Sequence, residues 1–267
     1  MQGWQTMDRA TLDDAYANAD HIDGAVDYPP RWATDAATFR DRTPATLDIP
    51  YDDVPGAAFD LFHPDGAPEG LVVFVHGGYW LRFGRSDWSH FASGALARGH
   101  AVAVVGYPLA PAVRIRDITR LIARAVDAAA ARVPGPIHLT GHSAGGHLVA
   151  RMVMANAAPA CIDRIVTCVP ISPVTDLRPF VALSMNADLH LDGAEAAAES
   201  PVLGLSVPGP RIAVHVGEKE RPSFLQMADA LGDAWDIPVH CTPNRHHFDV
   251  IDALRDPASP LMRDLLG

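Results

Sequence analysis

Short apolar runs alternate with longer segments in which apolar residues recur at helical spacing. The runs are rich in Val, Ile and Ala and lack polar alternation, which is typical of strands buried on both faces of a sheet. They predict strands over 71–76, 101–106, 137–140, 164–170, 211–216 and 237–242. The segments between them predict helices over 86–98, 112–132, 147–156 and 222–235, and a last helix from about 248. This alternation favours an α/β fold, with a mostly parallel sheet and helices on both faces.

The two remaining parts of the chain are less regular. Residues 1–45 are polar, and we interpret them as an N-terminal arm with a short helix near 12–18. Two strands, 46–51 and 57–63, follow across a turn rich in Asp, Pro and Gly. Residues 172–210 are long and irregular. We therefore predict one domain over 46–267 with a cap-like insertion around 172–210.

Charge and cysteine content narrow the choice of partners. With 32 acidic and 21 basic residues, the net charge is -11, which disfavours nucleic acid and anionic membrane surfaces. No apolar run approaches the roughly 20 residues of a membrane helix, and no signal peptide is evident. Cys161, Cys168 and Cys241 lack metal-ligand spacing, so we expect buried, reduced thiols. These features favour a cytoplasmic protein with a small-molecule substrate, and they leave a homodimer open.

A Gly-x-Ser-x-Gly pentapeptide, residues 141–145, directly follows one predicted strand and opens a helix. A sharp strand-to-helix turn of this kind lifts the serine hydroxyl above the sheet, while its glycines let strand and helix approach closely. The helix N-terminus behind the serine supplies unpaired N–H groups. The motif and its context predict that Ser143 is a nucleophile.

A second glycine-rich turn, His76-Gly77-Gly78-Tyr79-Trp80, follows the first buried strand. Acyl transfer requires N–H groups that already point to where negative charge develops on the substrate oxygen. Gly78, Tyr79 and Ala144 are the predicted donors, and Gly77 could replace either of the first two. We expect His76 and His142 to orient these loops.

A serine nucleophile requires a base, and a third group must orient that base. His247 follows the last predicted strand and is our choice of base, with His246 as the alternative. Glu220, after the strand at 211–216, is the predicted acid. Glu218 and Asp176 are the alternatives for that role. The order serine, acid, histidine is that of α/β-hydrolases.

The three motifs together, HGGYW, GHSAGGHL and HHFDVI, resemble the kynurenine formamidase (arylformamidase) group, which is related to hormone-sensitive-lipase-type esterases. The resemblance covers roughly residues 45–255. It implies an α/β-hydrolase fold and hydrolysis of N-formyl-L-kynurenine to formate and kynurenine in tryptophan breakdown. It also implies Ser143 as nucleophile, His247 as base and Glu220 as acid. Eukaryotic members usually carry Asp where this chain has Glu220, and Glu is a chemically adequate replacement.

The expected reaction is a two-step acyl transfer without metal or cofactor. A formyl group needs only a small acyl pocket, while the aryl part needs flat walls. The candidates for substrate contact are Gly77, Tyr79 and Trp80. Two further aromatic candidates are Phe180 and Trp88. Arg82, Arg178 or Asn186 could bind the substrate carboxylate, and Tyr28 and Trp32 of the arm could cover the site. A short-chain carboxylesterase is the alternative function, and a non-catalytic binding protein of the same fold is a remote one.

Overall fold

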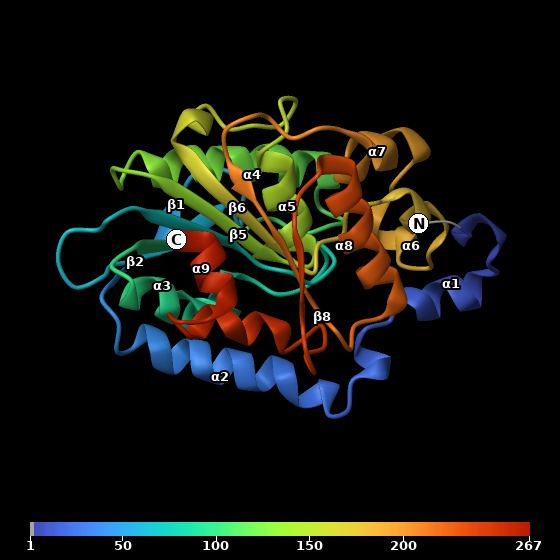
Figure 1. Ribbon diagram of the computed structural model, residues 1–267, viewed down its shortest axis with the longest axis horizontal. Helices are drawn as coiled ribbons and strands as arrows, with labels where there is room; N and C mark the ends of the chain where they lie inside the picture. The colour runs from blue at the N-terminus through green and yellow to red at the C-terminus, as the bar shows by residue number, and fades with distance from the viewer. Residues whose placement is uncertain (1–2) are drawn as a thin grey trace.

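The computed structural model describes residues 3–267, and a nine-stranded sheet forms its centre (Figure 1). The strand order is β1 (Ala45–Pro50), β2 (Ala58–Phe62), β4 (Ala101–Val105), β3 (Leu71–Val75), β5 (Ile137–His142), β6 (Ile165–Ile171), β8 (Val214–Gly217) and β9 (Val239–Thr242). A two-residue strand, β7 (Arg211–Ile212), also pairs with β6. The β1–β2 and β2–β4 pairs are antiparallel and the others are parallel. The predicted α/β fold is confirmed.

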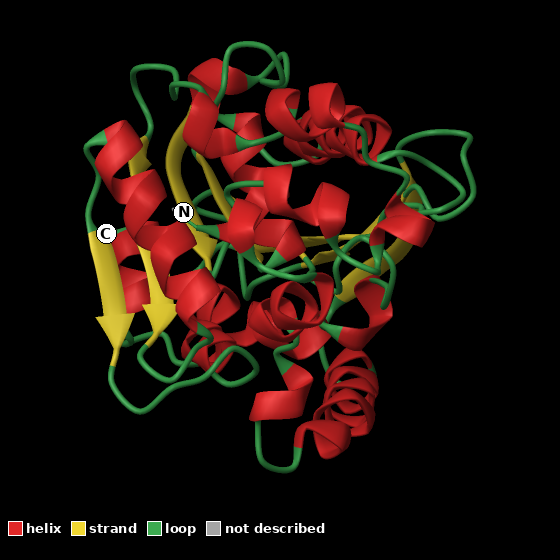
Figure 2. Cartoon of the chain, turned by 90° about the vertical axis from the view of Figure 1, so that its right-hand side faces the viewer, coloured by secondary structure: helices red, strands yellow, loops and turns green. Residues whose placement is uncertain are grey.

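The central strands are apolar because both faces of the sheet are covered. Along β3, Val73 belongs to the core under α4 (Ile115–Ala130), α5 (Ala144–Met152) and α8 (Pro222–Trp235). Val72 and Phe74 point to the opposite core, which includes side chains of α3 (Ser93–Ala97) and α9 (Pro260–Leu266). Figure 1 shows these two helical layers above and below the sheet, and Figure 2 shows them from the side.

The N-terminal region folds onto this core. Its first α-helix, α1 (Arg9–Tyr16), starts at Asp8, whose carboxylate accepts a hydrogen bond from the N–H of Thr11 (2.8 Å). A longer helix, α2 (Tyr28–Arg40), was not predicted. Its prolines, Pro29 and Pro30, occupy the first turn, where a missing N–H costs nothing. Residues 3–45 therefore carry helices packed on the domain.

Three other segments depart from the predicted elements. The predicted helix 86–98 consists of two 3₁₀ turns, η4 (Arg85–Asp87) and η5 (Ser89–Ala92), followed by the short helix α3. The predicted strand 211–216 is interrupted at Ala213, which separates β7 from β8. The expected last helix consists of a 3₁₀ segment, η9 (Val250–Arg255), and α9.

Residues 172–210 contain four short helical segments. They are η7 (Arg178–Ala182), α6 (Asn186–Leu189), α7 (Gly193–Ala198) and η8 (Pro201–Leu203). Buried acidic side chains attach this insertion to the helices below it. Glu195 pairs with Arg114, and Glu199 pairs with Arg151 of α5 (3.2 Å). The insertion is therefore fixed to the domain by buried ion pairs.

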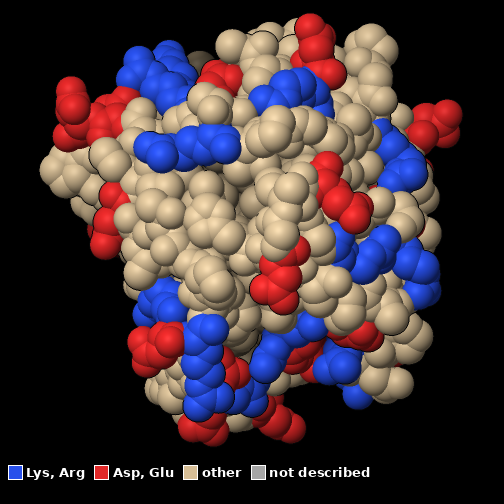
Figure 3. All heavy atoms as spheres, turned by 90° about the vertical axis from the view of Figure 1, so that its left-hand side faces the viewer, with Lys and Arg blue, Asp and Glu red and all other residues tan. Residues whose placement is uncertain are grey.

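The surface and the cysteines can be compared with the expectations, and the exposure of one cysteine differs from them. Acidic and basic side chains are interspersed on the face that Figure 3 displays. Within residues 3–267, no helix has the length and apolar character needed to cross a membrane. Cys168 is buried, and burial raises the pKa of its thiol. The expectation of burial is wrong for Cys241, which lies exposed on edge strand β9.

Candidate active site

Ser143 occupies a strained turn between β5 and α5. Its backbone has φ 57° and ψ −115°, a conformation that side-chain-bearing residues rarely adopt. A Cβ at Gly145 would overlap the carbonyl oxygen of Val75, and one at Gly141 would overlap that of Gly145. The N–H of Ser143 donates to the carbonyl of Ile171 (2.8 Å). Small neighbours and this anchor hold the serine at the carboxyl end of the sheet.

Glu220 and His247 form a buried pair. Oε2 of Glu220 lies 2.7 Å from Nδ1 of His247, and the carboxylate side chain is 0% exposed. The other carboxylate oxygen accepts from the N–H of Gly217 (3.0 Å) and from the hydroxyl of Ser172. A buried carboxylate needs such donors, because water cannot solvate it. These bonds fix the carboxylate and leave Nε2 as the imidazole nitrogen available for other chemistry.

The loop that carries His247 is attached to the turn that carries Ser143. Nε2 of His142 donates to the backbone carbonyl of His247 (2.8 Å), and the two ring centroids lie 4.7 Å apart. Burial lowers the pKa of His142 well below its usual value, so its ring is neutral at pH 7. Phe224 of α8 packs on the His247 ring, with centroids 4.5 Å apart. His142 therefore has a positioning role.

The alternative acid and base candidates are engaged elsewhere. His246 bonds to the hydroxyl of Tyr28 (3.1 Å) and lies 3.2 Å from Asp249. Glu218 is exposed and accepts from the N–H of Asn244 (2.8 Å). Asp176 forms an ion pair with Arg178 (2.7 Å). Of the three acid candidates, Glu220 is the one in contact with His247.

The glycine-rich turn lies against the serine turn. A Cβ at Gly77 would come within 3.1 Å of the Ser143 Cβ. Gly78, Tyr79 and Trp80 all have positive φ (112°, 54° and 60°), so the backbone folds back tightly here. Within residues 3–267, the turn and loop hydrogen bonds do not use the N–H groups of Gly78, Tyr79 or Ala144. These three groups are available to bind an oxyanion.

His76 supports this turn from beneath. Its ring stacks on Tyr107 with centroids 4.3 Å apart, and its carbonyl accepts from the Tyr107 hydroxyl (2.9 Å). Burial lowers the pKa of His76 to about 4, so it is a neutral structural group at pH 7.

The aromatic candidates have different surroundings. Tyr79 donates through its hydroxyl to the carbonyl of Tyr16 in α1 (2.6 Å) and accepts from Asn18 (3.2 Å). Trp80 is fully buried against Phe180 and His147. Tyr79 thus connects the glycine-rich turn to the N-terminal region.

The remaining aromatic candidates are Trp88 of the domain and the arm residues Tyr28 and Trp32. Trp88 and Trp32 are buried together, with ring centroids 4.8 Å apart. Tyr28 contacts His246, the neighbour of His247, through its hydroxyl. Of the two arm residues, Tyr28 reaches the histidine loop while Trp32 packs in the core.

The three candidates for a carboxylate-binding group are also separated by their contacts. Arg178 is paired with Asp176, and Asn186 bonds to the backbone of Val181 and Leu191. Arg82, two residues beyond the glycine-rich turn, is exposed and forms no ion pair within the described residues. Of the three candidates, Arg82 is therefore the one whose cationic group has no ion-pair partner within the described residues.

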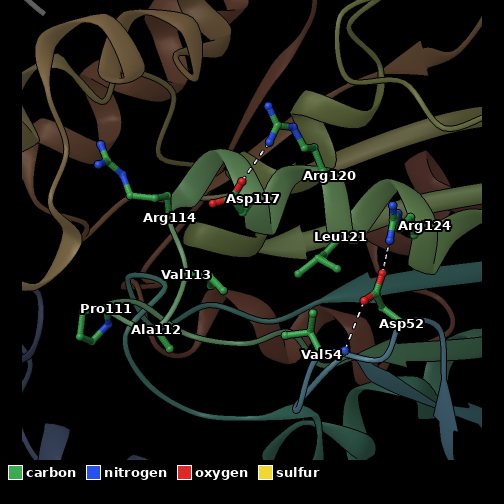
Figure 4. Close-up of a pocket in the computed structure, with 10 residues that line it drawn as sticks. All are labelled: Asp52, Val54, Pro111, Ala112, Val113, Arg114, Asp117, Arg120, Leu121 and Arg124. Atoms are coloured by element: carbon green, nitrogen blue, oxygen red, sulfur yellow. Dashed lines mark hydrogen bonds and ion pairs between the residues drawn. The ribbon is translucent and has the colours of Figure 1, made fainter.

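One cavity lies beside this site, and another lies away from it. One of about 230 Å³ is bounded by α1 and by Arg221, Pro222 and Ser223, which directly follow Glu220. Another, of about 360 Å³, lies over α4, where Arg124 pairs with Asp52 and Arg120 with Asp117 (Figure 4). Pairing neutralises those two arginines, so the second cavity is not a strong anion site.

Sequence reasoning missed two contributors to the site. Ser172, which bonds to Glu220, has φ 46° and directly follows β6. Its position after a buried strand was the available signal. The second contributor is the backbone carbonyl of Tyr16. No sequence signal pointed to it, because every residue has a backbone carbonyl.

The strand order, the strained serine turn and the buried Glu220–His247 pair define the class of protein as an α/β-hydrolase. The profile of the family described as alpha/beta hydrolase fold matches residues 72–200. The chain belongs to this family and is a hydrolase.

Named relatives cover nearly the whole chain. A kynurenine formamidase of Danio rerio is 24% identical over 100% of this chain and 98% of its own length. A crystal structure of a candidate thioesterase from Silicibacter sp. TM1040 is 49% identical, covers 96% of this chain and 99% of its own, and has a TM-score of 0.94. An esterase of Pyrobaculum calidifontis, at 18% identity, covers 96% of this chain and 97% of its own with a TM-score of 0.68. This last likeness concerns the fold.

Proposed function

We propose that the protein is a serine hydrolase that cleaves a small acyl amide of the N-formylkynurenine type. The observation that carries the proposal is the buried Glu220–His247 pair, attached through His142 to the strained turn of Ser143. The full-length similarity to a kynurenine formamidase favours a formyl amide as substrate. With an N-formylkynurenine substrate, the products are formate and kynurenine, as in tryptophan breakdown.

In the first step, the Ser143 oxygen attacks the formyl carbon while Nε2 of His247 accepts the hydroxyl proton. Glu220 stabilises the imidazolium and holds its orientation. The negative charge on the carbonyl oxygen is met by the N–H groups of Gly78, Tyr79 and Ala144. The C–N bond then breaks, and the amine departs with the proton from His247. Ser143 is left as a formyl ester.

In the second step, water attacks the formyl ester and gives its proton to His247. The tetrahedral intermediate collapses, His247 returns the proton to the Ser143 oxygen, and formate leaves. Each proton moves between His247 and the reacting oxygen or nitrogen, so the cycle needs no metal or redox cofactor. The exposed guanidinium of Arg82 is the proposed partner of the substrate carboxylate.

Hydrolysis of an oxygen ester or a thioester would use the same groups. A short-chain carboxylesterase is the second candidate. The relative at 49% identity, described as a candidate thioesterase, adds thioesters to the substrates that need testing. All these reactions pass through an acyl-serine, and they differ in the leaving group and in the size of the acyl pocket.

The deciding experiment compares turnover of N-formylkynurenine, p-nitrophenyl acetate, p-nitrophenyl butyrate and acetyl-coenzyme A, with Ser143→Ala as the blank. The proposal expects the highest kcat/KM for the formamide. Efficient ester or thioester turnover with negligible formamide cleavage would reject the formamidase assignment while keeping the hydrolase mechanism. Full activity in Ser143→Ala would reject the mechanism itself.

A further inference from the structure

A cluster of three potential metal ligands lies at the β9 edge of the sheet. His215 on β8 and His240 on β9 are directly paired in parallel register, so their side chains point to the same face. Asp264 of α9 completes the cluster. The ligand atoms of the three residues all lie within 4.8 Å of one another. Three elements distant in sequence thus bring two imidazoles and one carboxylate together.

Both imidazoles lie close to the same carboxylate oxygen of Asp264. Nε2 of His215 lies 2.8 Å from Oδ2 of Asp264, and Nε2 of His240 lies 3.4 Å from it. A single hydrogen bond would account for His215 and Asp264 but leaves the approach of His240 unexplained. The surface pair His21–Asp14, also 2.8 Å apart, brings one histidine to its carboxylate, whose second partner is Arg221 (2.7 Å).

We propose that His215, His240 and Asp264 bind a divalent transition-metal ion, for which Zn²⁺ is the probe. Imidazole nitrogen with carboxylate oxygen is a donor set that suits Zn²⁺, whereas Mg²⁺ and Ca²⁺ prefer oxygen alone. Zinc bonds of about 2.0–2.1 Å at tetrahedral angles place ligand atoms roughly 3.3 Å apart. The His240–Asp264 separation already matches, and the His215–Asp264 separation must widen by roughly half an ångström.

That widening is structurally feasible, because one of its two partners can move. His215 is 2% exposed and fixed within β8, whereas the Asp264 side chain is 35% exposed. Zinc binding at Nε2 of His215 requires the tautomer protonated at Nδ1, so the proton that Nε2 shares with Asp264 moves to Nδ1. With three protein ligands, water takes the fourth position. The Arg211 guanidinium donates to the backbone carbonyl of Asp264 (3.0 Å), so a positive charge lies beside this cluster and lowers the expected affinity for a cation.

The bound ion would connect the edge strand, its neighbour and the C-terminal helix. It therefore stabilises the fold and has no step in the hydrolytic reaction. The link to the catalytic groups is indirect. The carbonyl of His215 accepts from the N–H of Ser172 (2.7 Å), and the Ser172 hydroxyl bonds to Glu220. Loss of the ion is expected to leave the chemical step in place.

The test is a calorimetric titration of the untagged full chain with Zn²⁺, together with Tm measurements. We expect one bound ion and a Tm rise of roughly 5 °C at a hundredfold excess over Kd. His240→Ala and Asp264→Asn should each weaken binding at least tenfold and abolish the Tm rise. His21→Ala, which removes the matched surface pair, should bind as the unchanged chain does.

Visible absorption of Co²⁺ bound to the unchanged chain gives a second readout of nitrogen and oxygen ligation. Unaltered Zn²⁺ affinity in both His240→Ala and Asp264→Asn, or absence of binding to the unchanged chain, would overturn the proposal. Should His240→Ala fail to fold, Asp264→Asn and the Co²⁺ spectrum decide. Hydrolytic activity is measured alongside and is expected to persist in both variants.

Discussion

The Ser172 hydroxyl donates to the oxygen of Glu220 that does not face His247. Ser172 therefore acts through the carboxylate and has no contact with the reacting atoms in the proposed mechanism. Replacing it with alanine should let the Glu220 carboxylate rotate, and with it the imidazole. We expect Ser172→Ala to lower kcat by roughly 10- to 100-fold with little change in KM.

Steady-state kinetics on the best substrate checks this expectation. Ser93→Ala is the matched control, since Ser93 is a serine on α3 whose hydroxyl makes only a long contact, 3.5 Å, to the backbone of Arg255. An unchanged kcat in Ser172→Ala would show that Gly217 and His247 alone hold the carboxylate.

The assignment of the acid is tested by two isosteric amide substitutions. Glu220→Gln removes the charge that stabilises the His247 imidazolium and should reduce kcat by about 10³–10⁴-fold. Glu218→Gln, only two positions away and exposed, should retain nearly full activity. If the two variants exchange these behaviours, the acid is Glu218.

Much of this site follows from local and topological rules. Small residues at 141 and 145 are required wherever a serine turn packs against a neighbouring strand, so the motif identifies Ser143. In a parallel sheet, loops after successive strands share one edge, which brings Glu220 and His247 together. The Ser172 hydroxyl and the His247 carbonyl depend on tertiary placement of ordinary groups. Helix α2 was missed because Pro29 and Pro30 suggest a break unless the helix is known to start there.

Arg82 provides a test of substrate charge. Arg82→Ala should raise KM for N-formylkynurenine by about tenfold, because the α-carboxylate loses its partner. The KM for neutral p-nitrophenyl acetate should stay unchanged, and Arg82→Lys should restore part of the affinity. Arg116→Ala removes another exposed arginine as a control. Equal effects on charged and neutral substrates would remove Arg82 from the carboxylate site.

His90 provides a test of pH-dependent stability. Burial, aided by the charge of Arg255, lowers the pKa of His90 to about 4, and within residues 3–267 neither ring nitrogen has a hydrogen-bond partner. In the unfolded chain, the histidine pKa is about 6.5. Between the two pKa values, the unfolded chain therefore binds a proton that the folded chain does not bind. The free energy of unfolding is therefore fully retained above about pH 6.5 and falls as the pH drops towards 4.

His90→Leu should weaken this dependence, by at most about 1.4 kcal/mol per pH unit, because an apolar side chain takes up no proton. Urea unfolding at pH 7, 6 and 5 measures the effect, with His21→Leu as the exposed control. Parallel pH curves for His90→Leu and the unchanged chain would show that His90 takes up its proton equally in the folded and unfolded states.

The contacts of α1 have a consequence for the order in which the protein assembles. Tyr16 receives the Tyr79 hydroxyl and packs against Phe224, and Phe224 in turn packs against His247. In the proposed mechanism, one wall of the catalytic centre thus comes from an early part of the chain and its base from a late part. During synthesis, the strands up to β6 can pair before residue 247 has emerged from the ribosome. The turn of Ser143 can therefore form in the nascent chain before His247, the proposed base, is available.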